Sequence, residues 1–322
     1  MPDDKVAAGR IVDLSAGRQR DERAEVVARL LDSPATIAPR WFYDELGCAL
    51  YGAICRLPEY YPTRTEASIF ATQRAALRAI VGTRKECIDL GAGDCSKAPL
   101  WFDLFTPSRY VAVDIARDAL ARALPALAAR HPGVEMLGVV ADFTHGLDLA
   151  RDLRGGPVTF VYPGSSIGNF APHDALRLLR AIRRHCGDDA SGLLIGVDTK
   201  KDVARLTAAY DDAQGVTAAF NRNVLLHVNR ILGTRFDPSA FAHVALYASE
   251  ASRIEMHLEA RSEQSVVIDG IERTYACGER ILTEHSYKYA PDEFEALLGM
   301  AGFRRVTRFQ DAAGDFAVYY AA

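Results

Sequence analysis

Short apolar segments alternate with helical segments along the middle of this 322-residue chain, and this alternation restricts the fold more than any other feature. Each segment is almost continuously apolar, which is typical of strands buried on both faces of a parallel sheet. We expect five such strands, at residues 87–90, 110–114, 134–140, 158–162 and 192–198. Two later runs, 303–309 and 316–320, flank a turn and predict an antiparallel hairpin. The pattern predicts an α/β fold on a doubly wound sheet of seven strands.

The segment between residues 200 and 286 interrupts this α/β pattern. It contains two helical stretches and three strand-like runs, at 202–213, 217–232, 253–260, 264–276 and 279–289. A second unusual stretch, 40–66, is rich in tyrosine and tryptophan and is bracketed by prolines, as loops that carry binding groups often are. A chain of this length suggests about two domains. We therefore expect an additional α+β domain beside the sheet.

Composition argues against several classes of protein. The chain has 38 basic and 42 acidic residues, a net charge of −4, and its basic clusters are short and offset by nearby acidic residues, so we expect no nucleic-acid partner. No apolar run approaches the ~20 residues that a membrane span needs, and the charged N-terminal segment lacks the apolar core of a secretory signal. The six cysteines are scattered without metal-ligand spacing. We expect a cytoplasmic protein with no membrane contact and no metal site.

Polar and glycine residues follow three of the predicted strands. The first strand runs into Gly91-Ala92-Gly93, the second ends at Asp114, and the third ends at Asp142-Phe143. Glycines at this point let the backbone approach a ligand closely, and a carboxylate at the end of the second strand can hold ribose hydroxyls. Phe143 offers a face for an adenine ring. The three positions together predict a nucleoside-binding site at the carboxyl ends of the strands.

The residues after the two glycines distinguish between cofactors. A dinucleotide needs a third glycine for close packing of helix on strand, with its pyrophosphate at the helix N-terminus. Ser96 stands at that place here and is followed by Lys97. The acidic strand ends Asp89, Asp114 and Asp142 fit the adenosine and amino-acid ends of S-adenosylmethionine better than a dinucleotide, so a dehydrogenase is disfavoured.

Five longer stretches resemble one known family. They are WFYDELG…RLPEYYPTRTE (41–66), PGSSIGNF (163–170), AYDDAQGVTAAFNRN (209–223), RIEMHLEAR (253–261) and ILTEHSYKY (281–289). In order and spacing they resemble the histidine Nα-methyltransferases of ergothioneine biosynthesis, from about Arg40 onward. The resemblance implies a class I S-adenosylmethionine-dependent methyltransferase that transfers three methyl groups to the α-amine of free L-histidine, giving hercynine.

The resemblance also implies a set of site residues. Cofactor contacts are implied at Gly91, Gly93, Lys97, Asp114, Asp142 and Phe143. The implied amino-acid pocket takes its catalytic groups from Tyr60, Asn169 and Tyr210, with Gly164 and Tyr43 close by. Imidazole recognition is implied for Glu284 and Ser286, with Met256 lining the pocket. The cofactor turn departs from the commoner pattern at Asp94-Cys95, which bears on the detailed cofactor contacts.

The resemblance implies two domains, each formed by two segments of the chain. Residues 62–199 and 287–322 form the methyltransferase domain, and residues 1–61 and 200–286 form a substrate-binding domain. We expect a monomer.

The residue types suit this chemistry. Glu284 and Ser286 are two apart in a strand-like run, so their side chains share a face and can bind both nitrogens of an imidazole. Methyl transfer is a direct displacement that depends mostly on alignment, so we expect no obligatory catalytic base. A tyrosine face such as that of Tyr43 can stabilise the growing cation by cation–π attraction.

Two other functions are compatible with these residues. The same chemistry could act on another free amino acid such as tryptophan or tyrosine, although Glu284 and Met256 favour histidine. Alternatively, the chain could be a non-catalytic module that binds an adenosyl ligand. Methylation of a single amino acid by the purified protein distinguishes these functions.

Overall fold

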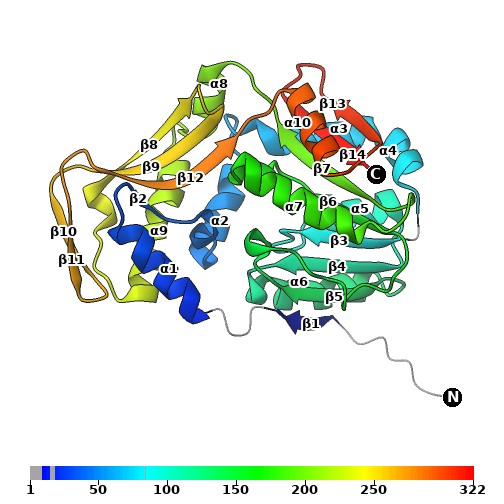
Figure 1. The fold of residues 1–322 in the computed structure, drawn as a ribbon, viewed down its shortest axis with the longest axis horizontal. Coiled ribbons are helices and arrows are strands. Elements are labelled where there is room, and N and C mark those ends of the chain that lie inside the picture. Colours follow the sequence, from blue (N-terminus) through cyan, green and yellow to red (C-terminus); the bar gives the residue numbers. More distant parts are fainter. Residues whose placement is uncertain (1–8, 15–18, 84) are drawn as a thin grey trace.

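The computed structural model describes residues 9–14, 19–83 and 85–322. Its main feature is an eight-stranded sheet with the strand order β1-β5-β4-β3-β6-β7-β14-β13 (Figure 1). In chain order the strands are β1 (Arg10–Asp13), β3 (Glu86–Leu90), β4 (Arg109–Asp114), β5 (Glu135–Val140), β6 (Val158–Tyr162), β7 (Gly192–Asp198), β13 (Val306–Gln310) and β14 (Phe316–Ala321).

Seven of these strands agree with the predicted sheet. The five predicted parallel strands pair as β5-β4-β3-β6-β7, and the terminal hairpin adds β14 antiparallel to β7, with β13 beyond it. The eighth strand was not predicted. β1 pairs in parallel with β5, Arg10 opposite Leu137, at the edge of the sheet. Its four residues, RIVD, lie in a polar segment. So short a strand is stabilised by pairing with the edge strand β5, and the sequence around residues 10–13 does not indicate that pairing.

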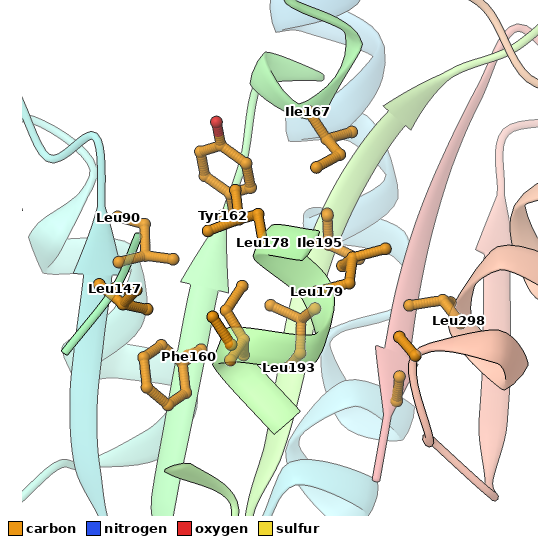
Figure 2. Close-up of a cluster of buried hydrophobic side chains, with 14 of the residues drawn as sticks. Leu90, Leu147, Phe160, Tyr162, Ile167, Leu178, Leu179, Leu193, Ile195 and Leu298 are labelled. Atoms are coloured by element: carbon orange, nitrogen blue, oxygen red, sulfur yellow. The ribbon is translucent and has the colours of Figure 1, made fainter. Parts of the chain in front are cut away.

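Apolar side chains cover both faces of the large sheet. Ile88 and Phe160 belong to one buried cluster, whereas their neighbours Cys87 and Val161 belong to another, as alternation along a strand requires. Figure 2 shows part of the first cluster, in which Leu179 packs with the strand residues. The helices on this face are α7 (Pro172–His185) and α10 (Pro291–Met300); those on the other are α3 (Tyr61–Thr72), α4 (Arg74–Val81), α5 (Ala98–Phe105) and α6 (Arg117–Arg130).

A second, smaller sheet lies beside the first (Figure 1). Its order is β2-β12-β9-β8, formed by β2 (Ala35–Thr36), β8 (Phe241–Ala248), β9 (Arg253–Ala260) and β12 (Arg280–Tyr287). The associated helices are α1 (Gln19–Leu31), α2 (Glu45–Ile54), α8 (Val203–Ala208) and α9 (Val216–Leu232). One buried cluster combines side chains from residues 26–61 and 206–281, so the N-terminal and inserted segments share a core.

The strand-like run at 264–276 is two strands instead of one. β10 (Gln264–Ile268) and β11 (Ile271–Tyr275) form an antiparallel hairpin around Asp269-Gly270. Both turn residues have positive φ, 50° and 84°, which is the conformation that tight two-residue hairpins require. The Asp-Gly pair is the sequence signal that the prediction missed.

The two sheets approach each other where β12 ends. The short helix η3 (Ser166–Asn169) follows β6, and a Cβ on its Gly168 would lie only 2.8 Å from the backbone oxygen of Tyr287. Only glycine permits so close an approach. Just beyond, Thr199 and Tyr289 form a bridge between the chain after β7 and the chain after β12. The loop after β6 is therefore held against the end of the smaller sheet.

Candidate functional site

The predicted glycine turn lies between β3 and α5. Gly91 and Gly93 have φ values of 69° and 54°, and a Cβ at Gly93 would meet no atom within 4 Å, so the turn borders open space. Asp114, at the end of β4, accepts hydrogen bonds from the backbone N–H groups of Gly93 at 2.7 Å and Ala116 at 2.8 Å. Burial raises the pKa of Asp114. This carboxylate braces the turn while lying beside it.

The third strand end is tied to the N-terminal part of the chain. Asp142 caps the short helix η2 (Phe143–His145) by accepting from the N–H of Thr144 at 2.9 Å. Its other oxygen accepts from Nη1 of Arg40 at 2.8 Å. The ring of Phe143 lies edge-on to Tyr162, with centroids 5.8 Å apart. Asp142 and Phe143 thus lie at the strand end where the adenine contact was predicted.

Asp89 differs from the other strand-end acids. It is buried, and its carboxylate accepts from the indole N–H of Trp101 at 2.9 Å and the hydroxyl of Tyr110 at 2.8 Å. Burial raises the pKa of Asp89 to about 6. Both donors are aromatic residues of the core, so these hydrogen bonds hold the end of β3, where the glycine turn begins, against the core.

Lys97 and Gly164 meet at a residue that sequence reasoning missed. Glu66, buried on α3, accepts from Nζ of Lys97 and from the N–H of Gly164, each at 2.7 Å. Its carboxylate crosses β7 at Gly196, where a Cβ would lie 2.1 Å from Oε1 of Glu66. Glu66 ends one of the motif stretches, but a single acid on a helix reads as a surface residue, and no local pattern indicates its role.

All eight predicted substrate residues line one cavity. These residues are Tyr43, Tyr60, Gly164, Asn169, Tyr210, Met256, Glu284 and Ser286. The cavity is completed by residues that were not singled out, namely Tyr51, Ile54, Ser165, Ser166, Ala209, Thr217 and Phe220. The loop after β6, the smaller sheet and the helices packed on it each contribute to its lining, so the site is formed by residues far apart in sequence.

A β-bulge places the residues that were predicted to bind the imidazole ring. The pairing of β12 with β9 shifts between Leu282 and Glu284, so that Glu284 lies opposite Met256 and Ser286 opposite Ile254. Thr283 is the extra residue. Ile281 and Glu284 are three residues apart, so a regular strand would place them on opposite faces, whereas the extra residue puts both on the same face. The bulge brings the two predicted imidazole ligands onto the inner face, beside Met256.

Glu284 is poised between its two protonation states. Burial raises the pKa of this carboxyl group to about 7, although the nearby Lys288 lowers it. Near neutral pH, the side chain can therefore act as a hydrogen-bond donor or acceptor. An imidazole ring presents one donor and one acceptor nitrogen, and a carboxyl group with this pKa can serve either.

Aromatic rings form another part of the cavity lining. Tyr51 lies edge-on to Tyr43 and Tyr60, with centroids 5.8 and 6.4 Å apart, and Tyr60 is 6.2 Å from Tyr210. Phe220 of α9 lies 6.1 Å from Tyr43. Tyr51 and Phe220 fall inside the aromatic and motif stretches of the sequence, but only the packing of α2 on α9 shows that their rings face the cavity.

A buried lysine connects two of the predicted residues. The hydroxyls of Tyr210 and Ser286 are 2.7 Å apart, and Nζ of Lys288 donates to both, at 2.9 and 2.8 Å. Lys288 also pairs with Asp198 at 2.7 Å. No local sequence pattern indicates that Lys288 belongs to the site, since lysines are seldom fully buried.

No group of three or more His, Cys, Asp or Glu in the part of the chain that the structure describes could hold a metal ion. None of the helices within the described ranges combines the length and apolar character needed to cross a membrane.

Comparison with known proteins gives consistent results. Residues 22–322 match the family model of the histidine-specific, SAM-dependent methyltransferases. The histidine N-alpha-methyltransferase of Mycolicibacterium smegmatis is 40% identical over 302 residues, covering 92% of this chain and 93% of that protein. The protein of the same name from Mycobacterium tuberculosis is 39% identical over 93% of this chain and 94% of its own length. Ergothioneine biosynthesis protein 1 of Schizosaccharomyces pombe is 27% identical, covering 86% of this chain and 37% of that protein.

Proposed function

Because the chain belongs to the family of histidine-specific, SAM-dependent methyltransferases, we propose that it transfers three methyl groups from S-adenosylmethionine to the α-amino group of L-histidine, giving hercynine for ergothioneine biosynthesis. The strand order and the antiparallel β14 are those of the class I methyltransferase fold predicted from the sequence. The observation that carries the substrate proposal is the single cavity lined by Glu284, Ser286, Asn169 and Tyr210.

The residues around the glycine turn suit S-adenosylmethionine. The open space before Gly93 and the positive φ of both glycines leave room for a ligand against the backbone. We assign the ribose contact to Asp114 and the adenine contacts to Asp142 and Phe143, with Gly91, Gly93 and Lys97 along the rest of the cofactor. When bound, this cofactor supplies an electrophilic methyl group on a sulfonium.

The cavity residues divide by the end of histidine that they bind. Asn169, Tyr60 and Tyr210 offer an amide and two hydroxyls to the α-carboxylate and the amine, next to Gly164. Glu284 and Ser286 bind the imidazole nitrogens, and Met256 and Tyr43 pack against the substrate. A pocket of this kind disfavours amino acids that lack ring nitrogens, since its buried polar groups would lose their partners.

The tyrosines act as donors and not as bases. Burial raises the pKa values of Tyr60 and Tyr210, and that of Tyr60 lies well above its ordinary value. Both hydroxyls therefore keep their protons at neutral pH and can orient the substrate amine without removing a proton from it. This supports the expectation that alignment supplies most of the catalysis.

The domain boundaries follow the same division of labour. We assign residues 62–199 and 287–322 to the methyltransferase domain and residues 1–61 and 200–286 to the substrate-binding domain. The core shared by the N-terminal and inserted segments supports this division. We expect a cytoplasmic protein. We also expect a monomer, and sedimentation of the purified protein tests this oligomeric state.

Mass spectrometry of a competition reaction tests the function. The purified protein is incubated with S-adenosylmethionine and an equimolar mixture of free amino acids. Histidine alone is expected to gain three methyl groups. A gain on tryptophan or tyrosine instead would contradict the roles of Glu284 and Ser286, and no gain on any amino acid would favour the non-catalytic binding module.

A further inference from the structure

Lys288 is a charged side chain enclosed directly behind the cavity. It is 1% exposed and follows the last residue of β12. An ammonium group has three N–H donors, and each has a partner here: Oδ2 of Asp198 at 2.7 Å, the Ser286 hydroxyl at 2.8 Å and the Tyr210 hydroxyl at 2.9 Å. Lys288 therefore holds two cavity hydroxyls, which we have assigned to opposite ends of the proposed substrate.

The hydrogen bonds of these two hydroxyls can be counted. Each hydroxyl has one hydrogen and two acceptor lone pairs, and each accepts from Lys288. The 2.7 Å contact between Tyr210 and Ser286 uses one of their two hydrogens, in either direction. The pair thus keeps one donor and one acceptor for a ligand. If Tyr210 donates to the ligand, Ser286 must accept from it, and the reverse also holds.

The charge of Lys288 is compensated by the carboxylate of Asp198, which does not line the cavity. Asp198, which is fully buried, also accepts from Lys201 at 2.5 Å and from the Tyr61 hydroxyl at 2.7 Å. Burial lowers the pKa of Lys288, but the carboxylate of Asp198 and the oxygen of Tyr210 together raise it above its ordinary value. The ammonium group therefore stays charged near neutral pH and keeps all three donors.

We propose that Lys288 is a positioning residue that holds Tyr210 and Ser286 as one hydrogen-bonded unit, so that recognition of the amino-acid end and of the ring end of the substrate is coupled. This inference rests on the proposed function. Lys288 itself need not touch the substrate. It acts by keeping both hydroxyls in place and by fixing how many donors they present to histidine.

The test replaces Lys288 by methionine, which matches the four-atom stem of the lysine side chain and removes the ammonium donors. Lys201→Met is the matched control, because it removes the other cation from Asp198 and touches no residue that lines the cavity. Either variant leaves Asp198 paired with one lysine and with Tyr61. Calorimetry measures the affinity for S-adenosylmethionine, and initial rates give KM and kcat for histidine.

Lys288→Met is expected to raise KM for histidine roughly 10- to 100-fold, the size expected for losing hydrogen bonds to a charged donor, with an unchanged affinity for S-adenosylmethionine. Lys201→Met is expected to change KM by less than about threefold. Equal effects of the two variants would show a general structural role and overturn the proposal. An unchanged KM in Lys288→Met would do the same.

A double-mutant cycle tests the coupling without altering Lys288, and so covers the case in which Lys288→Met fails to fold. Tyr210→Phe and Ser286→Ala are measured singly and together for histidine binding. Coupled hydroxyls predict a loss in the double variant that departs at least about threefold from the product of the single losses. Additive losses would contradict the proposal. Wild-type protein that methylates no histidine in these assays would instead refute the proposed function.

Discussion

Glu284 brings a carboxyl group into the cavity lining, and its ionisation links the site to the stability of the fold. Burial raises its pKa from 4.5 to about 7. The folded protein therefore keeps a proton that the unfolded chain releases. The free energy of unfolding consequently falls as pH rises from 4.5 to about 7, and the loss is complete above the folded-state pKa.

Glu284→Gln should remove this loss, because an amide does not titrate. We compare the free energy of unfolding of the variant with that of the wild type at each pH. This difference should be about 2 kcal/mol more in favour of the variant at pH 8 than at pH 5. Urea denaturation at the two pH values measures the difference. Glu272→Gln, on the exposed side of β11, is the control, and its free energy of unfolding should follow that of the wild type at both pH values. Parallel pH profiles for Glu284→Gln and wild type would rule out this account of Glu284.

The bulge in β12 belongs to a network that links three elements to Tyr210. The Thr283 hydroxyl donates to Oδ1 of Asn221 on α9 at 2.7 Å. The amide of Asn221 contacts Nδ1 of His243 on β8 at 2.8 Å, and Nε2 of His243 lies 2.8 Å from the backbone oxygen of Tyr210. Because Asn221 is fully buried, its oxygen depends on Thr283 for a partner.

Thr283→Val tests this network with almost no change in shape. The variant leaves the buried oxygen of Asn221 without this donor, which should lower the free energy of unfolding by about 1–3 kcal/mol. Thr274→Val, at an exposed position of β11, should change it by no more than about 0.5 kcal/mol. Thermal and urea unfolding compare the two variants. Equal stability of both would mean that Thr283 shapes the bulge without supporting the network.

At the scale of the whole molecule, Glu66 connects the two halves of the site. One carboxylate holds Lys97 beside the cofactor turn and the backbone of Gly164 beside the substrate cavity. Its burial and the absence of a side chain at Gly196 keep it in place. The residue after the glycine turn and the loop after β6 therefore share the same carboxylate partner.

Glu66→Gln should weaken the binding of both ligands. Lys97 and Gly164 donate to different oxygens of Glu66, and a single amide oxygen cannot accept both hydrogen bonds without rearrangement. We expect about a tenfold loss of affinity for S-adenosylmethionine, and a similar loss for histidine in the presence of S-adenosylhomocysteine. Calorimetry measures both affinities, with Glu45→Gln on the exposed side of α2 as the control. A loss confined to one ligand would show that Glu66 serves only one half of the site.

The sequence indicates local features well and contacts between distant segments poorly. The parallel strands and the glycine turn are predictable because each has its own periodicity or spacing, and the predicted cavity residues came from long motifs. Glu66, Lys288 and the bulge at Thr283 could not be predicted, because their roles depend on partners that lie dozens of residues away in the sequence. β1 was missed for the same reason: four residues form a strand only because the edge of β5 is available.

A crystal structure with histidine and S-adenosylhomocysteine tests the central claim most directly, namely that one cavity binds both ends of histidine. We expect the imidazole nitrogens within about 3 Å of Glu284 and Ser286, and the α-carboxylate beside Asn169 and Tyr210. In that pose the α-amine points toward the sulfur near Gly164. An imidazole ring seated elsewhere, or a carboxylate bound at Glu284 and Ser286, would contradict it.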